Sequence, residues 1–263
     1  MDQLIAYAEK LPFLQQQLPW QLCWINGKEW IADTLAQHLI SYGRLVAAPV
    51  MLCPYYPDEE AANLEAGFAL EHLILKATEL GLGTLWFSSE EFQDLITGEL
   101  LEYGNNPEEK QGKGLSLIKP LPQNLEEVLK PFYLPNIILF GYPSEKRMDR
   151  IINNAIRMES AGNSRKQLDG LFLSKKAKGL PKPVLEALNL ALTAPSKRNQ
   201  QPWRMRVTEK GLDIGFLHKR QIAAGIFIAH LKIAFEEKGV NFKMNFISER
   251  NNDIDWVIQI VLL

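Results

Sequence analysis

Two segments of the chain carry side chains that could hold a cofactor. Residues 195–199 read Pro-Ser-Lys-Arg-Asn, so Ser196 and Asn199 present short donors and acceptors on a turn and Lys197 adds a positive charge. Residues 85–89 read Leu-Trp-Phe-Ser-Ser, in which two rings can pack near a flat ligand and two hydroxyls can reach its polar edge. The alternative for the first segment is a capping turn before a helix or strand.

Four other conspicuous side chains have plainer explanations. Trp20 and Trp203 each follow a proline and are expected to anchor the core rather than contact a cofactor. His72 and His230 lie in the middle of predicted helices, where we expect structural hydrogen bonds rather than catalysis.

The elements that must position these segments follow from the hydrophobic pattern. Helices are predicted over 2–11, 31–42, 61–80, 183–194 and 221–238. Strands are predicted over 21–25, 46–56, 84–89, 136–140, 203–207, 212–217 and 255–263. Asn26-Gly27 reads as a tight turn and Lys210-Gly211 as a hairpin turn, and Pro49 suits an edge or a bulge better than a central strand position. The polar stretch 98–124 is expected to be a surface excursion and 144–167 a linker. Helix and strand are roughly equal in extent and hairpins are more frequent than βαβ units, which predicts an α+β fold.

Two pairs of segments match without gaps, which indicates an internal repeat. Residues 11–21 align with 194–204, where Pro, Gln, Pro and Trp coincide. Residues 66–81 align with 224–239, where Ala, Gly, His, Leu, Glu and a final Gly coincide. Chance similarity between two amphipathic helices would explain the second pair alone, but two ordered pairs favour duplication.

The two copies have decayed in a complementary way. The second copy keeps Ser196 and Asn199 in its turn, where the first copy has Phe13 and Gln16. Conversely, the first copy keeps Gly-Leu-Gly-Thr-Leu-Trp at 81–86, where the second copy has Gly-Val-Asn-Phe. Each copy has thus kept the element that the other lost.

Three motifs resemble those of the nitroreductase family. The segment 194–204, APSKRNQQPWR, resembles the family's Ser/Asn turn, and 69–87, ALEHLILKATELGLGTLWF, resembles its GLGT helix-to-strand element. The segment 136–143, NIILFGYP, resembles the strand end that follows in that family. Ordinary members carry the Ser/Asn turn before the GLGT element. The reversed order here resembles the branch in which one chain with two degenerate half-copies stands in for the usual dimer.

The resemblance implies a nitroreductase-like α+β fold. Two tandem α/β half-domains, 1–150 with the GLGT element and 151–263 with the Ser/Asn turn, would form an intrachain pseudo-dimer with antiparallel or mixed sheets. One FMN site per chain is then expected, with contacts from Pro195, Ser196, Lys197, Asn199, Leu85, Trp86, Phe87, Ser88 and Ser89. The duplicate position, where Phe13 and Gln16 would meet 240–243, is expected to be filled by side chains.

The flavin phosphate needs fixed donors and positive charge. The family's basic N-terminal segment has no counterpart before the first predicted helix. The resemblance therefore assigns the phosphate to Arg165 and Lys166, for which simple linker charges are the alternative.

The implied activity is that of an FMN-dependent NAD(P)H oxidoreductase that reduces nitroaromatics, quinones or similar electron-poor acceptors. The flavin, not a catalytic side chain, would carry the chemistry. The alternative is a non-catalytic flavin-binding, or flavin-free, structural or sensor descendant of the same fold. Because the usual subunit interface would be internal, we expect a monomer or a weak homodimer.

Composition narrows the partners and the compartment. The formal net charge is −2, which gives no basic field for nucleic acid or an anionic membrane. Cys23 and Cys53 have neither CxxC nor zinc-finger spacing, so no metal site and no disulfide scaffold is expected. The sequence shows no signal peptide and no apolar run long enough to span a membrane. A cytoplasmic location is the simplest expectation.

Overall fold

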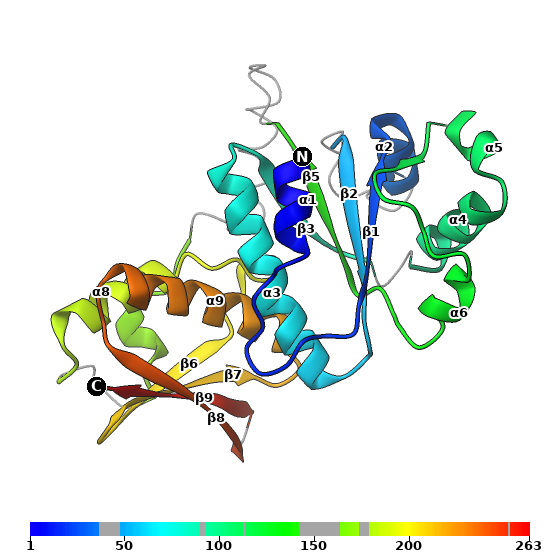
Figure 1. Ribbon diagram of the computed structural model, residues 1–263. Helices are drawn as coiled ribbons and strands as arrows, with labels where there is room; N and C mark the ends of the chain where they lie inside the picture. The colour runs from blue at the N-terminus through cyan, green and yellow to red at the C-terminus, as the bar shows by residue number, and fades with distance from the viewer. Residues whose placement is uncertain (37–47, 90–92, 113, 143–163, 174–178, 252) are drawn as a thin grey trace. The chain divides into compact units, whose positions relative to one another are not determined.

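The computed structural model describes residues 1–36, 48–89, 93–112, 114–142, 164–173, 179–251 and 253–263 (Figure 1). In chain order the elements are α1 (Asp2–Ala8), β1 (Gln21–Asn26), α2 (Lys28–Ala36), β2 (Val50–Tyr55), α3 (Glu60–Glu79), β3 (Gly83–Ser88), α4 (Gln93–Asn105), α5 (Pro107–Gly112), β4 (Ser116–Leu117), α6 (Leu125–Leu129), β5 (Asn136–Gly141), η2 (Leu168–Leu171), α8 (Lys182–Ala191), η3 (Lys197–Asn199), β6 (Trp203–Thr208), β7 (Gly211–Leu217), α9 (Gln221–Glu237), β8 (Phe242–Asn251) and β9 (Ile254–Leu262).

Two compact units make up the chain, and each combines segments that are distant in sequence. The first consists of Met1–Leu4, Gln17–Glu59 and Ile74–Arg150. The second consists of Ile5–Gln16, Glu60–Leu73 and Ile151–Leu263. An early arm and most of helix α3 therefore pack with the C-terminal part of the chain. The units are interleaved in sequence, and the division into halves at residue 150 stays a prediction.

Each unit contains one antiparallel sheet, and the two sheets share one strand order. The first sheet runs β3-β5-β2-β1-β4 and the second runs β6-β7-β9-β8. Without the short strand β4, the first sheet read from the other end is β1-β2-β5-β3. In both orders the strand that follows the Pro-Trp pair comes first, and the strand that follows the long central helix comes last. This equivalence confirms the α+β prediction and supports the duplication seen in the sequence.

The first sheet corrects one expectation. Strand β2 is central rather than at an edge. Pro49 lies just before the strand, and Pro54 lies beyond the three residues that pair with β5. Asn26-Gly27 makes a tight connection, as expected, since β1 ends at Asn26 and α2 begins at Lys28. The first unit's core forms on this sheet, where Trp24 and Phe140 are in contact at 5.6 Å between ring centroids.

The stretch 98–124 is not a surface excursion. It contains most of α4, all of α5 and strand β4, and it buries Leu100 and Leu115 in the core of the first unit. The buried ammonium of Lys110 forms ion pairs with Glu99 at 2.8 Å and with Glu102. The polar residues that suggested a loop instead cover the outer face of these short helices.

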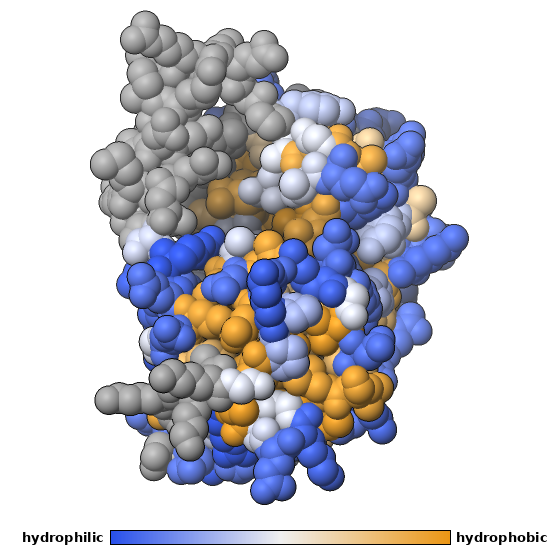
Figure 2. Space-filling view, turned by 90° about the vertical axis from the view of Figure 1, so that its left-hand side faces the viewer, coloured by the Kyte–Doolittle hydropathy of each residue, from blue (hydrophilic) through white to orange (hydrophobic). Residues whose placement is uncertain are grey.

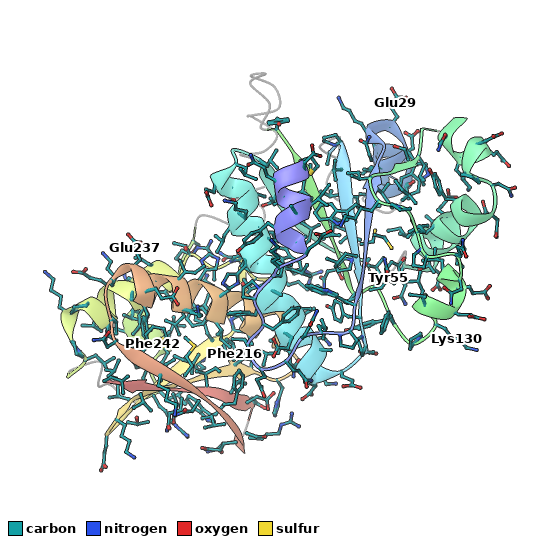
Figure 3. The ribbon with its side chains drawn as sticks, viewed as in Figure 1. Glu29, Tyr55, Lys130, Phe216, Glu237 and Phe242 are labelled. Carbon is teal, nitrogen blue, oxygen red and sulfur yellow. The ribbon has the colours of Figure 1, made fainter. Side chains whose placement is uncertain are left out.

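Aromatic packing between helix α9 and the sheet builds the core of the second unit. Trp203 stacks on Phe227 of α9 at 4.6 Å between centroids. Phe216 and Phe242, labelled in Figure 3, meet Phe227 and Phe235 of the same helix edge to face at 6.1 and 5.0 Å. Trp203 is fully buried, which confirms its expected role as a core anchor, whereas Trp20 in the first unit is only half-buried.

Some hydrophobic side chains of the second unit remain exposed. Figure 2 shows hydrophobic side chains at the surface between charged ones on the side that it draws. The large exposed hydrophobic residues of this unit include Leu173, Leu190 and Ile233. Scattered exposure of this kind is normal for a folded chain and points to no particular partner.

Within the second unit, helices α3 and α9 cross at two glycines that are equivalent in the repeat. A Cβ added to Gly67 would lie 2.3 Å from Ile222 O, and one added to Gly225 would lie 2.1 Å from Leu64 O. Leu64 and Ile222 are themselves related by the repeat offset of 158 that relates the glycines (222 − 64 and 225 − 67). The contact is thus reciprocal, as at a two-fold interface between identical subunits.

Replacing either crossing glycine by alanine should destabilise the protein. The methyl group must push two helix backbones apart, and overpacking of this kind typically costs about 1–3 kcal/mol. We expect Gly67→Ala and Gly225→Ala each to lower the free energy of unfolding by about 2 kcal/mol in urea titrations. Gly98→Ala is the matched control, because a Cβ there meets nothing within 4 Å and alanine favours the helix by roughly 1 kcal/mol. Equal stability of all three variants would refute the tight crossing.

The two thiols should report on opening of the first unit. Cys23 and Cys53 lie opposite each other on β1 and β2 and are buried and free. Burial raises the pKa of Cys23 to about 12 and that of Cys53 well above its ordinary value, so neither forms the reactive thiolate near neutral pH. We expect a disulfide reagent at pH 8 to label neither thiol in the native protein and both in denaturant. Fast, stoichiometric labelling of the native protein would contradict this burial.

Candidate functional site

The predicted Ser/Asn turn has an unusual backbone. It follows helix α8 and contains the short 3₁₀ turn Lys197–Asn199. Arg198 and Asn199 both have φ of 51° and Gln201 has φ of 48°, so three residues other than glycine occupy the left-handed region. This conformation costs each such residue roughly 1–2 kcal/mol, so it persists only where surrounding contacts require it.

Side-chain hydrogen bonds hold the turn in this left-handed conformation. The carboxamide of Asn199 donates from Nδ2 to Ser164 O at 2.6 Å and accepts at Oδ1 from Arg165 Nη1 at 2.8 Å. Buried Gln201 donates from Nε2 to the same Ser164 O, and its backbone N–H donates to Ser196 Oγ at 2.9 Å. The turn is therefore fixed by its own polar groups and by the segment that begins at Ser164.

Arg165 and Lys166 are thus more than linker charges, because both brace the turn. Arg165 also donates to the carbonyls of Thr193 and Ala194. Lys166 Nζ donates to the carbonyls of Gln200 at 2.7 Å and Gln201 at 3.2 Å. The structure brings this basic segment and the turn together, and the role of both toward a flavin and its phosphate stays a prediction.

Among the residues that the structure describes, no carboxylate pairs with this cluster. Within the described segments, the side chains of Arg165 and Lys166 are hydrogen-bonded only to carbonyl and amide oxygens. Burial lowers the pKa of both groups, and the nearby charge of Arg204 lowers that of Lys166 further. A group whose pKa is lowered by a like charge gains from an anion, so the cluster suits a negatively charged ligand.

Strand β3 carries the remaining predicted residues, in the first unit. Leu85 is 47% exposed, whereas Phe87 packs against the core of that unit. Ser89 is fully buried, and its hydroxyl donates to Leu134 O, so it supports the strand end. Trp86 and Ser88 are partly exposed. The turn belongs to the second unit.

Both central histidines make structural hydrogen bonds, as expected. His230 Nε2 lies 2.8 Å from the buried carboxylate of Glu71, and His230 Nδ1 lies 3.4 Å from Thr193 Oγ1. His72 Nδ1 lies 2.9 Å from Phe68 O, and burial lowers the pKa of His72. Glu71 was not singled out from the sequence; a carboxylate one position before a repeated histidine is the signal that could have identified it.

The duplicate turn is held by a different device. The buried carboxylate of Glu65 on α3 accepts backbone N–H groups from Leu14 and Gln15, both at 2.7 Å, and from Gln16 at 3.4 Å. Successive N–H groups that converge on one anion form an anion nest. Sequence reasoning missed Glu65, because nothing in its helical context distinguishes it from a solvated glutamate.

The duplicate position is hollow, which corrects the expectation that side chains fill it. A cavity of about 480 Å³ lies within the second unit and is lined by Phe13, Leu14, Phe68, Lys232, Glu236, Val240, Asn241, Phe242, Met244 and Phe246. The expected blocking residue, Phe13, stands at its wall. The turn cannot move inward to fill the space, because Glu65 fixes its backbone.

Two further searches of the described residues give negative results. No group of three or more His, Cys, Asp or Glu side chains there could hold a metal ion. No helix in the same part of the chain is long and apolar enough to cross a membrane.

Comparison with known proteins gives matches in structure. No family model and no curated protein matches the sequence. A putative nitroreductase from Thermotoga maritima matches over 100% of this chain and 84% of its own, with a TM-score of 0.54 and 16% identity. An FMN-dependent nitroreductase from Clostridium difficile matches over 56% of this chain and 76% of its own, with a TM-score of 0.36 and 19% identity.

The first match covers every element described above, so it bears on the whole chain. At 16% identity it concerns the fold and not the activity. The second match is partial and adds nothing to that assignment. Together with the repeated strand order and the paired helices, the full-length match leads to one conclusion: this chain has the nitroreductase-like α+β fold.

Proposed function

We propose that the chain is an FMN-dependent NAD(P)H oxidoreductase that reduces nitroaromatics, quinones or similar electron-poor acceptors. The observation that supports this most directly is the bracing of the Ser/Asn turn by Arg165 and Lys166. These two segments lie far apart in the sequence, and the family resemblance had assigned both to one cofactor. The contact between the basic segment and the turn places the positive charges of Arg165 and Lys166 beside a rigid backbone.

The residues of the cluster fit a flavin mononucleotide. A phosphate needs fixed cationic donors, and Arg165 and Lys166 are held in place by carbonyl groups, with no carboxylate partner among the described residues. Ser196 Oγ accepts the N–H of Gln201, so its own proton can be donated to a ligand oxygen. Asn199 uses both ends of its carboxamide within the protein, so we assign it to the shape of the turn rather than to direct contact.

Strand β3 is expected to contribute through its accessible residues. We propose Leu85, Trp86 and Ser88 as the flavin contacts of this strand, on the strength of the family resemblance. Phe87 and Ser89 would act indirectly, because one packs in the core and the other fixes the strand end. The bound flavin would take a hydride from NAD(P)H and pass electrons to the acceptor, while these residues hold and orient it.

Cofactor content is the first test of the proposal. The purified protein should be yellow or should take up FMN, and it should then oxidise NADH or NADPH in the presence of menadione or a nitrobenzoate. Replacing Ser196 and Asn199 together by Ala should weaken FMN binding by a few kcal/mol at most, as measured by fluorescence quenching. Gln16→Ala, at the duplicate turn, is the control and should change little. A colourless protein that cannot be reconstituted would instead favour the flavin-free descendant.

Comparing FMN with riboflavin isolates the phosphate contact. Lys166→Gln should weaken FMN binding about tenfold, roughly 1.4 kcal/mol, and leave riboflavin binding unchanged. Arg165→Gln should weaken both ligands, because Arg165 also holds Asn199 and the end of α8. Lys182→Gln removes a cation whose side chain is 87% exposed and serves as the charge control. Equal losses for FMN and riboflavin in Lys166→Gln would place the phosphate elsewhere.

A further inference from the structure

The cavity at the duplicate turn has walls that are fixed from three directions. The carboxylate of Glu65 holds the backbone of the arm that carries Phe13 and Leu14. Phe68, on the same helix as Glu65, is 1% exposed. Strand β8 is hydrogen-bonded to β9 along its length. The hollow is open to solvent on one side, and its volume of about 480 Å³ falls within the roughly 300–1,000 Å³ of small-molecule sites.

The wall provided by β8 is strongly apolar. Phe242, Met244 and Phe246 alternate along the strand, so all three point to the same face. This is the core face, because Met244 and Phe246 pair with Ile260 and Ile258, which are both fully buried. With Phe13 and Phe68, four phenylalanine rings and one thioether surround the space, and such groups favour contact with another aromatic ring.

The charges at the rim cancel each other. Lys232 and Glu236, four residues apart on α9, form an ion pair at 2.6 Å. Lys243 lies on the opposite face of β8, between the lining residues Phe242 and Met244. Unlike the cluster at Arg165, this hollow therefore offers no uncompensated positive charge to a phosphate.

We propose that this cavity is a second binding site, distinct from the flavin site, and that it takes an uncharged planar aromatic molecule of two or three fused rings. Its aromatic lining supplies the attraction, its volume sets the size, and the internal ion pair excludes an anion. In the repeat, this cavity occupies the position that corresponds to the proposed site beside the Ser/Asn turn, and it has aromatic rings where that turn has polar groups. The inference does not depend on flavin binding.

Binding of 1-aminoanthracene to the whole protein, followed by calorimetry with and without saturating FMN, tests the proposal. We expect binding of one equivalent that FMN does not displace. Met244→Trp and Leu14→Trp should each fill the cavity from a different wall and weaken binding at least about tenfold. Lys243→Trp places the same ring on the outer face of β8 and should leave the affinity unchanged. FMN titration of all three variants should match the original protein, which separates this test from that of the proposed function.

The effect of ligand charge on binding to the cavity can be measured separately. Anthracene-1-sulfonate has the same rings with a negative charge, and it should bind at least about tenfold more weakly than 1-aminoanthracene. Glu236→Gln removes the carboxylate that pairs with Lys232 and should reduce the difference in affinity between the two ligands severalfold.

Three outcomes would overturn the site. The first is a failure of 1-aminoanthracene to bind. The second is an affinity for 1-aminoanthracene in both Trp variants that equals the affinity of the original protein. The third is sedimentation that shows a dimer dissociated by Met244→Trp. The last would mean that a second copy of the chain covers this surface.

Discussion

The close crossing of α3 and α9 is the contact on which the second unit depends. Gly67 and Gly225 let two helix backbones approach to a distance that no side chain would permit. That approach places Glu71 against His230 and Phe68 beside the cavity. The same segment of α3 carries the carboxylate that fixes the early arm. A single steric condition, the absence of two Cβ atoms, therefore positions the hydrogen bond between Glu71 and His230, a turn and a hollow.

The two copies of the turn are braced by groups of opposite charge. Arg165, a cation, donates to the carbonyls and the amide oxygen around Asn199, and so the second copy keeps positive charge that an anion can use. Glu65, an anion, accepts the backbone N–H groups of the first copy, and so that copy has no need of a ligand to satisfy them. The divergence of the two sites follows from these braces as much as from the exchange of Ser196 for a phenylalanine.

The hydrophobic periodicity predicted the long helices and strands well. It failed in segments that contain many polar residues but still bury one face. The 3.6-residue pattern located α3 and α9, and the hairpin of β6 and β7 was evident from its turn. Strand β8 was missed although Phe242, Met244 and Phe246 alternate as in a half-buried strand, because its second half, 248–251, is entirely polar and lies at a sheet edge. The residue types of the turn were identified, but not Ser164, Glu65 or Gln201. Their partners depend on which segments meet in three dimensions, and a single sequence does not contain that information.

The order of the second sheet also constrains how the protein is made. Strand β9 is the last of its four strands to leave the ribosome, yet it lies between β7 and β8. Until it arrives, both neighbours present open hydrogen-bonding edges, and β8 has three apolar side chains on its inner face. The early arm and most of α3 also cannot pack until later in synthesis, because the C-terminal segments that they contact are made after them. The nascent chain therefore passes through a long period in which it can aggregate, and its yield should depend on chaperones that bind exposed strands.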